Sequence, residues 1–519
     1  MTQTDSVVLV LYLALVLGVG LFFRVRKGDH AEFFLAGRSM EWVPVGLSVM
    51  VTVFSAINYV ALPNEVFGYG LYVITALPVF FLAAWPITKI WMPFFHDMQL
   101  TSAYEYLERR FDARVRSLAS GVFILWRLFW MATALYACAK ILAALTGFPA
   151  YIIILVGGLA ATLYTSVGGM RAVMWTDVAQ FCVLFGGIAL GLAIAVSGNG
   201  FGELVDIAKE GGRLRPFAPF DPSFLSLNPC IRMTLWSGLI GVFVAFLARY
   251  GADQVVMQRY FAARSLPAAQ RGLWLNACAS VAALSLLVLF GLAIYAHAAK
   301  AGVFADAHWE TLSPMQKKGM AMRQLAAVIR SFPPGVTGLI AAGLLAATMS
   351  SIDSGINACC AAYVTDFHAR FFSSDSTAPK AGVWLDRGLT AALGTVATGF
   401  ALALIPLVGR TNSLFMIVNK IINGLGSPLL VLFLLGMFTR KANAPGMLLG
   451  GIVGFLASLF ISLSVKHLAL QYYAAANLLA TLVPCCLFSR FATALGHVQE
   501  PKTLTWTWHA WRESKQRIQ

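Results

Sequence analysis

Three small residues near the middle of the chain could together bind a hard cation. The segment that begins at Ala346 reads Ala-Ala-Thr-Met-Ser-Ser-Ile-Asp-Ser-Gly-Ile-Asn. On a helix, Ala347, Ser350 and Ser351 stand at i, i+3 and i+4 and therefore share one face. That face offers one backbone carbonyl and two hydroxyl oxygens, which are hard ligands of the kind that bind Na⁺. The alternative is that these serines bond within their own helix or pack against a neighbouring helix, as small residues in membrane helices often do.

The remaining ligands of such a site would have to come from a facing, unwound stretch of helix. The apolar run near 46–58 contains four polar residues, Ser48, Thr52, Ser55 and Asn58. Polar residues inside an apolar run predict a break in its helix. Val51 and Phe54 lie on either side of the expected break. Their backbone carbonyls are the natural additional ligands of an ion bound at the serine face.

These elements belong to a chain with the composition of an integral membrane protein. Of its 519 residues, 59% are hydrophobic and 12% charged, against about 45–50% and about 25% in soluble domains. Many apolar runs approach the roughly 20 residues that cross a bilayer as a helix. The first run lacks the flanks of a cleaved signal peptide and is expected to remain as a helix. We expect about thirteen spans, near 7–23, 41–62, 71–95, 116–146, 150–167, 175–197, 233–257, 272–296, 335–363, 387–408, 413–437, 446–464 and 470–488.

The net charge of +15 could suggest a nucleic-acid partner, but its distribution favours a membrane orientation. With the N-terminus outside, most Arg and Lys residues fall in inner loops, as the positive-inside rule requires. Arg259 is counted among these loop residues because the seventh span is expected to end near 257. We therefore expect a cytoplasmic membrane location with the C-terminus inside, and no nucleic-acid binding. The eight cysteines show no metal-ligand spacing.

Two spans carry polar groups at membrane depth, where such groups mark functional sites by default. One is the span near 41–62. The other is the span near 233–257, which continues into Asp253 and Gln254. Discontinuous helices at matching places in two halves of a chain are typical of transporters built from inverted repeats. The expected organisation is a first helix and inner loop (1–40), a first repeat (41–197), a second repeat (233–437), two accessory helices (438–488) and a cytoplasmic tail (489–519).

The tail is basic and carries three tryptophans, Trp506, Trp508 and Trp511. We expect it to lie on the inner membrane surface. The alternative is an unstructured tail.

Several segments resemble the sodium/solute symporter family. They are Glu32-Phe-Phe-Leu-Ala-Gly-Arg38, Leu100-Thr-Ser-Ala-Tyr-Glu-Tyr-Leu-Glu108 with Arg110-Phe-Asp112, Gly168-Gly-Met-Arg-Ala-Val-Met-Trp-Thr-Asp-Val-Ala-Gln180, Asp253-Gln254 through Gln258-Arg-Tyr260, and the serine-rich ninth span. They occur in the order of the family across about 30–440. The resemblance implies an all-α LeuT-type fold with two inverted repeats of five helices. It also implies sodium-coupled uptake of a small solute by alternating access, with Na⁺ as coupling ion and no other cofactor. We expect the chain to function as a monomer in the lipid bilayer.

By resemblance, the sodium site of the family falls on five positions. The carbonyls of Val51, Phe54 and Ala347 and the hydroxyls of Ser350 and Ser351 would hold the ion. All of these positions suit the role, because a carbonyl ligand tolerates any side chain.

A second sodium site, present in some members, would fall on Asp177, Ser350, Asp353 and Ser354. Asp353 departs from the pattern, because sodium-binding relatives usually carry Ser or Thr there. Ser350, Asp353 and Ser354 still stand at i, i+3 and i+4. The two carboxylates could bind a cation, or one of them could stay protonated. Alternatively, Asp353 could pair with Lys420 or Arg249.

The solute pocket is expected at the midplane between the broken helices. Its candidate residues are Val53, Ile57, Asn58, Leu77, Trp130, Phe246, Arg249 and Lys420. Trp130 and Leu77 stand where sialic-acid carriers show a carboxylate-binding arginine and a glutamine. Sialic acid is therefore not the expected solute, and the amide and carboxylate set of a sugar site is also missing.

Three basic residues lie within spans instead: Arg127, Arg249 and Lys420. Arg127 and Arg249 could clamp a carboxylate, because the guanidinium fork suits planar oxyanions. The alternative is that they pair internally with Asp353, Asp253 or Glu65, or reach an interface. A small organic anion is the expected substrate.

Three alternative functions would each require a different sequence feature. A sensor that keeps the symporter fold would carry a large C-terminal signalling domain, whereas this sequence ends about thirty residues after its last span. A sodium-independent carrier would have a degenerate ion site. A membrane enzyme would need a catalytic set, for which the pair Asp177 and Asp353 is the nearest candidate. Enzymatic activity is not expected.

Overall fold

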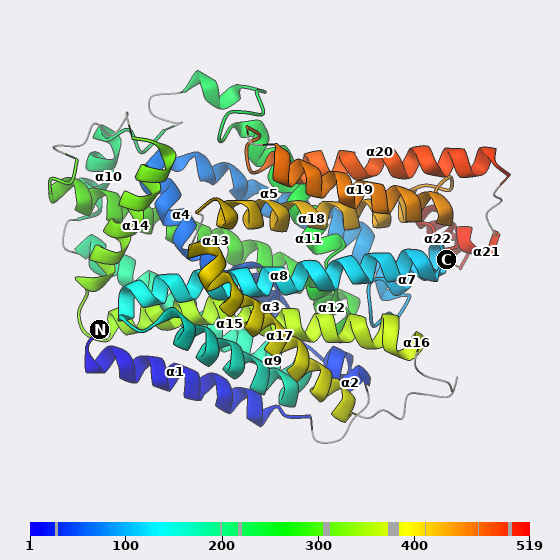
Figure 1. Cartoon of the computed structure of the whole chain (residues 1–519), viewed down its shortest axis with the longest axis horizontal. Helices are drawn as coiled ribbons and strands as arrows, with labels where there is room; N and C mark the ends of the chain where they lie inside the picture. Colours follow the sequence, from blue (N-terminus) through cyan, green and yellow to red (C-terminus); the bar gives the residue numbers. More distant parts are fainter. Residues whose placement is uncertain are drawn as a thin grey trace.

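Helices account for nearly all of the secondary structure in the computed structural model. The structure describes residues 1–25, 30–197, 200–215, 221–304, 312–371, 383–409, 412–465, 467–496 and 501–518. In these ranges it contains no β-strand, and its one β-bridge pairs Met40 with Ala263. Most of the long helices run along the long axis of the molecule, and the two chain termini lie near its opposite ends (Figure 1). Helices suit a membrane interior because they satisfy their own backbone hydrogen bonds.

The helices follow one another along the chain as α1 (Gln3–Phe22), α2 (His30–Leu35), α3 (Trp42–Val53), α4 (Ala56–Tyr69), α5 (Leu77–Pro86), α6 (Met92–His96), α7 (Glu105–Arg110), α8 (Ala113–Thr146), α9 (Ala150–Ser197), α10 (Phe201–Glu210), α11 (Val242–Gly251), α12 (Gln254–Ala262), α13 (Leu266–Lys300), α14 (Pro314–Arg330), α15 (Val336–Tyr363), α16 (Ala369–Phe371), α17 (Val383–Gly409), α18 (Asn412–Phe438), α19 (Ala444–Ser464), α20 (Tyr472–Ala494), α21 (Pro501–Leu504) and α22 (Trp508–Ile518). Short 3₁₀ or π-helical turns precede α5, α6, α11 and α16.

The described residues contain nine helical segments that are long and apolar enough to cross a membrane, or eleven if each of two bent pairs forms one span. The expectation of an all-α membrane protein is thus confirmed. The expected spans near 150–167 and 175–197 lie within one helix, α9. In α18, the described apolar segment Leu425–Phe438 is shorter than a membrane-spanning helix. The number thirteen therefore stays a prediction.

Both interrupted spans expected from the sequence are bent. Helices α3 and α4 meet at 65°, and the segment Ser237–Gly251, which includes α11, meets α12 at 51°. Between α3 and α4, Phe54 and Ser55 are extended, with ψ angles of 111° and 165°. The second interrupted span continues to Ala262 rather than ending near 257, so Arg259 lies in α12 inside the bundle. Its assignment to an inner loop was wrong.

The basic tail packs against the end of the bundle. The Trp511 indole Nε1 donates to Asp97 Oδ2 at 2.9 Å, and the Trp511 ring lies 6.0 Å from that of Phe94. The Tyr106 hydroxyl donates to the carbonyl of Trp506 at 3.1 Å. These contacts place helices α21 and α22, at the end of the tail, beside α6 and α7. Figure 1 shows both helices near α7. The described part of the tail, residues 501–518, is therefore structured, and its location on the inner membrane surface stays a prediction.

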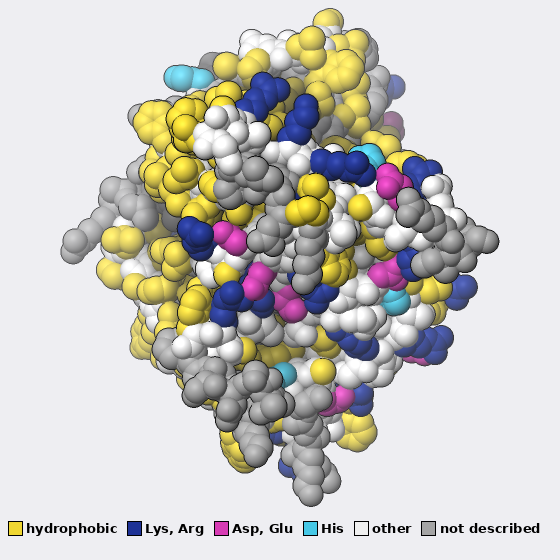
Figure 2. All heavy atoms as spheres, turned by 90° about the vertical axis from the view of Figure 1, so that its right-hand side faces the viewer, with side chains coloured by type: hydrophobic (Ala, Val, Ile, Leu, Met, Phe, Trp, Pro, Cys, Tyr) yellow, Lys and Arg dark blue, Asp and Glu magenta, His cyan; other side chains and the backbone are white. Residues whose placement is uncertain are grey.

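Charged side chains gather across this same end of the molecule, while hydrophobic side chains cover much of its flanks (Figure 2). Glu108 pairs there with Arg116 at 2.8 Å and also with Arg370. Burial raises the pKa of Glu108, but hydrogen bonds from the two arginines outweigh burial, and its net pKa is lowered. This charged end is compatible with a water-facing surface.

Helix α9 contains a break that only glycine adopts readily. Gly169 has φ +60° and ψ −160°, a conformation that is strained for any residue with a Cβ atom. A Cβ at this position would also lie 2.6 Å from the carbonyl oxygen of Phe33. Gly169 therefore allows α9 to change direction and α2 to approach it closely.

We expect Gly169→Ala to lower the melting temperature of the detergent-purified chain, because it introduces about 1–3 kcal/mol of backbone strain. Gly186→Ala is the matched control on the same helix, since a Cβ there would meet nothing within 4 Å. Equal melting temperatures for the two variants would show that the break at Gly169 does not require glycine.

Candidate ion and solute site

The serine face of α15 lies against the last turn of α3. The Ser350 hydroxyl donates to the carbonyls of Val51 and Ala347, both at 3.2 Å. The Ser351 hydroxyl donates to the carbonyls of Ala347 at 3.1 Å and of Thr52 at 3.5 Å. Both serine side chains are fully buried. Residues about three hundred positions apart thus place their oxygens together.

The break in α3 explains why these carbonyls are turned toward α15. Helix α3 ends at Val53, so the carbonyls of its last turn lack the amide partners that a continuing helix would supply. Those of Val51 and Thr52 accept serine hydroxyls instead. Phe54, the other predicted donor, is buried at the break itself. Sequence reasoning did not select Thr52.

A second cluster of buried polar groups surrounds Arg259 of α12. Its Nη2 donates to Asp177 Oδ2 at 3.1 Å, to Thr52 Oγ1 at 2.7 Å and to Ser354 Oγ at 2.5 Å. Its Nε donates to Ser48 Oγ at 2.6 Å. Each of these five residues has at most 3% of its surface exposed. One guanidinium group thereby joins α12 to α3, α9 and α15.

The four residues of the predicted second sodium site bond mainly to residues outside that set. Asp177 and Ser354 both bond to Arg259, whereas Ser350 bonds to Val51 and Ala347. The carboxylate of Asp353 accepts from Ser354, one of the four, and from Tyr164, which is not among them. The second sodium site stays a prediction, with a guanidinium group among its residues.

Asp353 accepts hydrogen bonds from the Tyr164 hydroxyl at 2.5 Å and from the Ser354 hydroxyl at 3.0 Å. Among the residues whose side chains are described, no ion pair links Asp353 to Arg249. Lys420, the other predicted partner and a predicted pocket residue, lies outside the described side chains. The Tyr164 hydroxyl also accepts from Gln180 Nε2 at 3.4 Å.

The two arginines proposed as anion clamps have different surroundings. Arg127 forms a buried ion pair with Asp253, which is the internal pairing considered from the sequence. Arg249 has its guanidinium carbon 5.7 Å from the ring centre of Trp130. Within the described part of the chain, the structure shows neither an ion pair nor a hydrogen bond for the Arg249 side chain. Arg249 is therefore the better candidate for an anion ligand.

Apolar and aromatic side chains lie near Arg249, on α11 and on neighbouring helices. Phe246 lies one turn before Arg249, and its ring lies 4.5 Å from that of Phe80 on α5. Leu77 is one turn before Phe80 on the same helix. The indole nitrogen of Trp130 is buried without a hydrogen-bond partner. These residues can form an apolar wall beside one guanidinium group.

The three pocket residues expected on the first broken helix lie around its break. Val53, Ile57 and Asn58 are each half-buried. The structure shows no hydrogen bond between Asn58 and Arg249, both of which it describes. Their joint role in one pocket stays a prediction.

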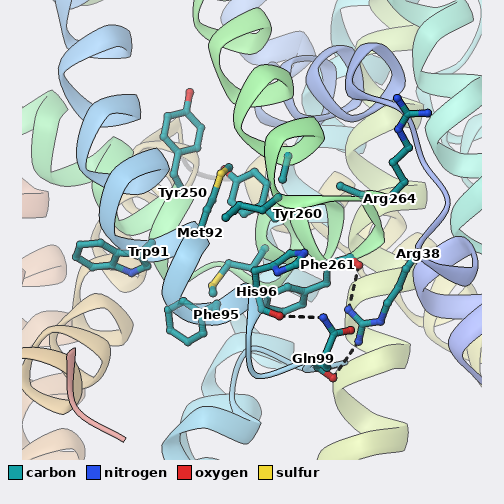
Figure 3. Close-up of a pocket in the computed structure, with 14 residues that line it drawn as sticks. Arg38, Trp91, Met92, Phe95, His96, Gln99, Tyr250, Tyr260, Phe261 and Arg264 are labelled. Carbon is teal, nitrogen blue, oxygen red and sulfur yellow. Dashed lines mark hydrogen bonds between the residues drawn. The ribbon is translucent and has the colours of Figure 1, made fainter. Parts of the chain in front are cut away.

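A cavity of about 190 Å³ lies elsewhere, between the α5–α6 segment, α12 and the start of α13 (Figure 3). Its lining includes none of the predicted site residues: Arg38, Trp91, Met92, Phe95, His96, Gln99, Tyr250, Met257, Tyr260, Phe261, Ala263, Arg264, Leu266 and Ala269. Arg38 closes one side by donating to the carbonyls of Phe261 at 3.1 Å and Gln99 at 2.9 Å. This cavity is distinct from the serine cluster.

Sequence reasoning missed Arg259 as part of the site. The residue stands in the segment Gln258-Arg-Tyr260, which carried part of the family resemblance, so a signal was present. Its polar neighbours instead favoured a loop.

Comparison with known proteins agrees with the fold. The family model described as the sodium:solute symporter family matches residues 33–454. Sodium-coupled monocarboxylate transporter 1 of Homo sapiens is 31% identical over 467 residues, which cover 89% of this chain and 73% of the relative. The sodium-dependent multivitamin transporter of Oryctolagus cuniculus is 30% identical over 463 residues, covering 88% of this chain and 70% of the relative.

The sodium/iodide cotransporter of Homo sapiens is 31% identical over 463 residues, covering 88% of this chain and 69% of the relative. A solved structure of a Na⁺-coupled sialic acid symporter, in a substrate-bound outward-open state, superposes with a TM-score of 0.81. It is 24% identical, and the match covers 94% of this chain and 98% of the other, so it shows a shared fold. From the extent of the family match and the identity to these relatives, the chain belongs to the sodium:solute symporter family.

Proposed function

We propose that this chain takes up a small organic anion with an apolar body across the cytoplasmic membrane, together with Na⁺, by alternating access. In this proposal about thirteen helices cross the membrane, with the N-terminus outside and the C-terminus inside. Two inverted repeats, 41–197 and 233–437, form the transport core, and one chain suffices for transport. The observation that carries the choice of an anion is the half-buried position of Arg249 beside Trp130, where it forms no ion pair with a carboxylate that the structure describes.

The ion would bind between the break in α3 and the serine face of α15. Carbonyls of Val51, Phe54 and Ala347 and hydroxyls of Ser350 and Ser351 would supply its oxygens, and four of these residues already contact one another. Na⁺ bound there would link the two helices. Na⁺ and a singly charged anion carry no net charge when they cross together, so the Na⁺ concentration gradient would supply the driving force, at about 1.4 kcal/mol per tenfold ratio.

The solute would bind with its charged group on Arg249. A guanidinium group within a membrane span is costly unless it has a partner, and a carboxylate can accept two parallel hydrogen bonds from it. Trp130 and Phe246 would contact the apolar body of the solute. Two of the similar proteins are named for anions, namely monocarboxylates and iodide, which agrees with this chemistry.

Uptake into proteoliposomes tests the proposal. Labelled lactate, pyruvate, butyrate, nicotinate and iodide would be offered with an inward Na⁺ gradient and with an equal K⁺ gradient. We expect the Na⁺ gradient to drive accumulation of at least one anion, but not of lactamide, a neutral amide of similar size. Equal uptake in Na⁺ and K⁺ would indicate a sodium-independent carrier and contradict the proposal.

Replacing both ion-site serines should abolish sodium binding while the chain still folds. For Ser350→Ala with Ser351→Ala, we expect the rise in melting temperature with added Na⁺ to disappear, because a ligand that no longer binds the folded state no longer stabilises it. Thr348→Ala is the control, since the Thr348 hydroxyl donates to the carbonyl of Leu344 in its own helix and not to a residue of the proposed ion site. A double variant that keeps the wild-type response to Na⁺ would place the ion elsewhere.

Replacing the proposed anion ligand should weaken solute binding. We expect Arg249→Gln to raise the apparent KM at least about tenfold, because hydrogen bonds to charged groups contribute about 1.5–3 kcal/mol each. Lys140→Gln removes the same charge from an exposed side chain of α8 and should leave KM unchanged. A KM for Arg249→Gln within twofold of wild type would exclude Arg249 as the anion ligand.

A further inference from the structure

The cavity between the α5–α6 segment, α12 and α13 combines aromatic rings with basic side chains (Figure 3). Its aromatic lining residues are Trp91, Phe95, Tyr250, Tyr260 and Phe261. Arg38, His96 and Arg264 also line it, and none of the described lining residues is Asp or Glu. A concave site that is mostly apolar, with a few polar groups, is typical of small-molecule binding.

The volume of the cavity limits the size of a ligand. An apolar protein cavity of about 150 Å³ holds one benzene molecule. At about 190 Å³, the cavity beside α12 has room for one six-membered ring with a small substituent. Figure 3 shows Trp91 and Arg38 on opposite sides of the cavity, with Tyr260 and Phe261 between them. An aromatic ring can therefore pack against rings of the lining while its substituent lies toward Arg38.

Arg38 is a half-buried cation at this cavity that forms no ion pair with a described carboxylate. Arg264 instead pairs with Glu41. The guanidinium of Arg38 donates to three backbone carbonyls. Glu105 acts on Arg38 only through its charge, and its carboxylate accepts from two backbone amides of its own segment. A carboxylate in the cavity would give Arg38 a direct counter-charge, for which the guanidinium geometry is suited.

The Tyr260 hydroxyl is a second polar group available to a ligand. Tyr260 is 7% exposed, and its hydroxyl is buried without a hydrogen bond to any described group. The polar atoms of two neighbouring rings are engaged. Trp91 Nε1 donates to the carbonyl of Gly251 at 3.2 Å. The Tyr250 hydroxyl accepts from Asn276 Nδ2 at 3.0 Å. Because buried polar groups nearly always have partners, the Tyr260 hydroxyl indicates a ligand that accepts a hydrogen bond.

The backbone beside Arg38 adopts a conformation that is unusual for residues with a side chain. Among the described non-glycine residues, positive φ angles occur at Ala36 (50°), Arg38 (53°) and Gln99 (50°). Arg38 and Gln99 both line the cavity, and Arg38 donates to the carbonyl of Gln99. Such angles are strained and cluster at functional sites. The strain here holds the guanidinium at the cavity before any ligand binds.

We propose that this cavity is a binding site for a small aromatic carboxylate, separate from the solute site at Arg249. The ring would pack among the aromatic side chains of the lining, and the carboxylate would accept hydrogen bonds from Arg38 and from the Tyr260 hydroxyl. Such a ligand would contact α6, α12 and α13 at once, since Ala269 of α13 also lines the cavity. The inference goes beyond the proposed function and does not depend on which solute is transported.

Equilibrium binding of labelled benzoate to detergent-purified Arg249→Gln, in K⁺ buffer without Na⁺, tests this proposal. Replacing Arg249 and omitting Na⁺ both weaken binding at the proposed solute site, so the cavity should account for saturable binding of one benzoate per chain. Adding Ala269→Leu fills part of the cavity and should lower the affinity at least about tenfold. Ala282→Leu adds the same side chain at an exposed position of α13 and should leave the affinity unchanged.

Two further comparisons test the assigned chemistry. Benzamide keeps the ring but lacks the charge, so it should compete with labelled benzoate at least about tenfold more weakly than unlabelled benzoate. Tyr260→Phe removes only the unpartnered hydroxyl and should lower the affinity at least about fivefold, because a hydrogen bond to a carboxylate is charge-assisted. Tyr250→Phe is the matched control, since that hydroxyl is engaged with Asn276.

Three results would overturn the proposal. They are the absence of saturable benzoate binding to a folded Arg249→Gln chain, an affinity that Ala269→Leu leaves unchanged, and benzamide that competes as well as benzoate. If Ala269→Leu does not fold, Tyr260→Phe decides, and an unchanged affinity in that variant contradicts the site. A chain that transports none of the anions offered would contradict the proposed function but leave this binding unaffected, because the measurement involves no transport.

Discussion

Every carbonyl that a helix break releases inside a membrane must find a partner other than water, and the break between α3 and α4 imposes that constraint at the centre of this structure. The carbonyls of Val51 and Thr52 meet it by accepting hydroxyls from α15. Because those hydroxyls are weak and replaceable partners, the same oxygens can also serve a cation. The proposed ion site is thus a consequence of how the break is accommodated.

Buried charges impose a second constraint, since an ion without a partner is costly in the interior. The structure meets it with specific pairs. Arg127 pairs with Asp253, the residue that also caps α12 by accepting from the amide of Val255 at 3.0 Å. Arg259 pairs with Asp177. Both pairs tie the second half of the broken α11–α12 span to other helices, so its position depends on charge as well as on packing.

Local pattern was sufficient for the features that depend on a single helix. The apolar runs located most of the long helices, the polar residues near 46–58 located the first break, and the i, i+3, i+4 spacing located the serine face. Arg259 could not be placed in the same way. Its burial depends on Asp177 and Ser354, which are 82 and 95 residues away, whereas its neighbours Gln254 and Gln258 read locally as a polar loop. The docking of the tail onto α6 and α7 likewise depends on a distant partner, Asp97.

The proposed Na⁺ and the Arg259 guanidinium are two positive charges that would have different effects on the helix bundle, because only Na⁺ can dissociate. The Na⁺ proposed at the Ser350–Ser351 face can dissociate, so its binding energy is available only while α3 and α15 are close. The Arg259 guanidinium cannot dissociate, so separating α12 from α9 would leave it and Asp177 without each other in the low-dielectric interior. The ion pair therefore favours arrangements that keep these two helices in contact, whether or not an ion is present. In this arrangement Na⁺ would be bound in only part of the transport cycle. The fixed charge of Arg259 would restrict which helices can move apart during the cycle.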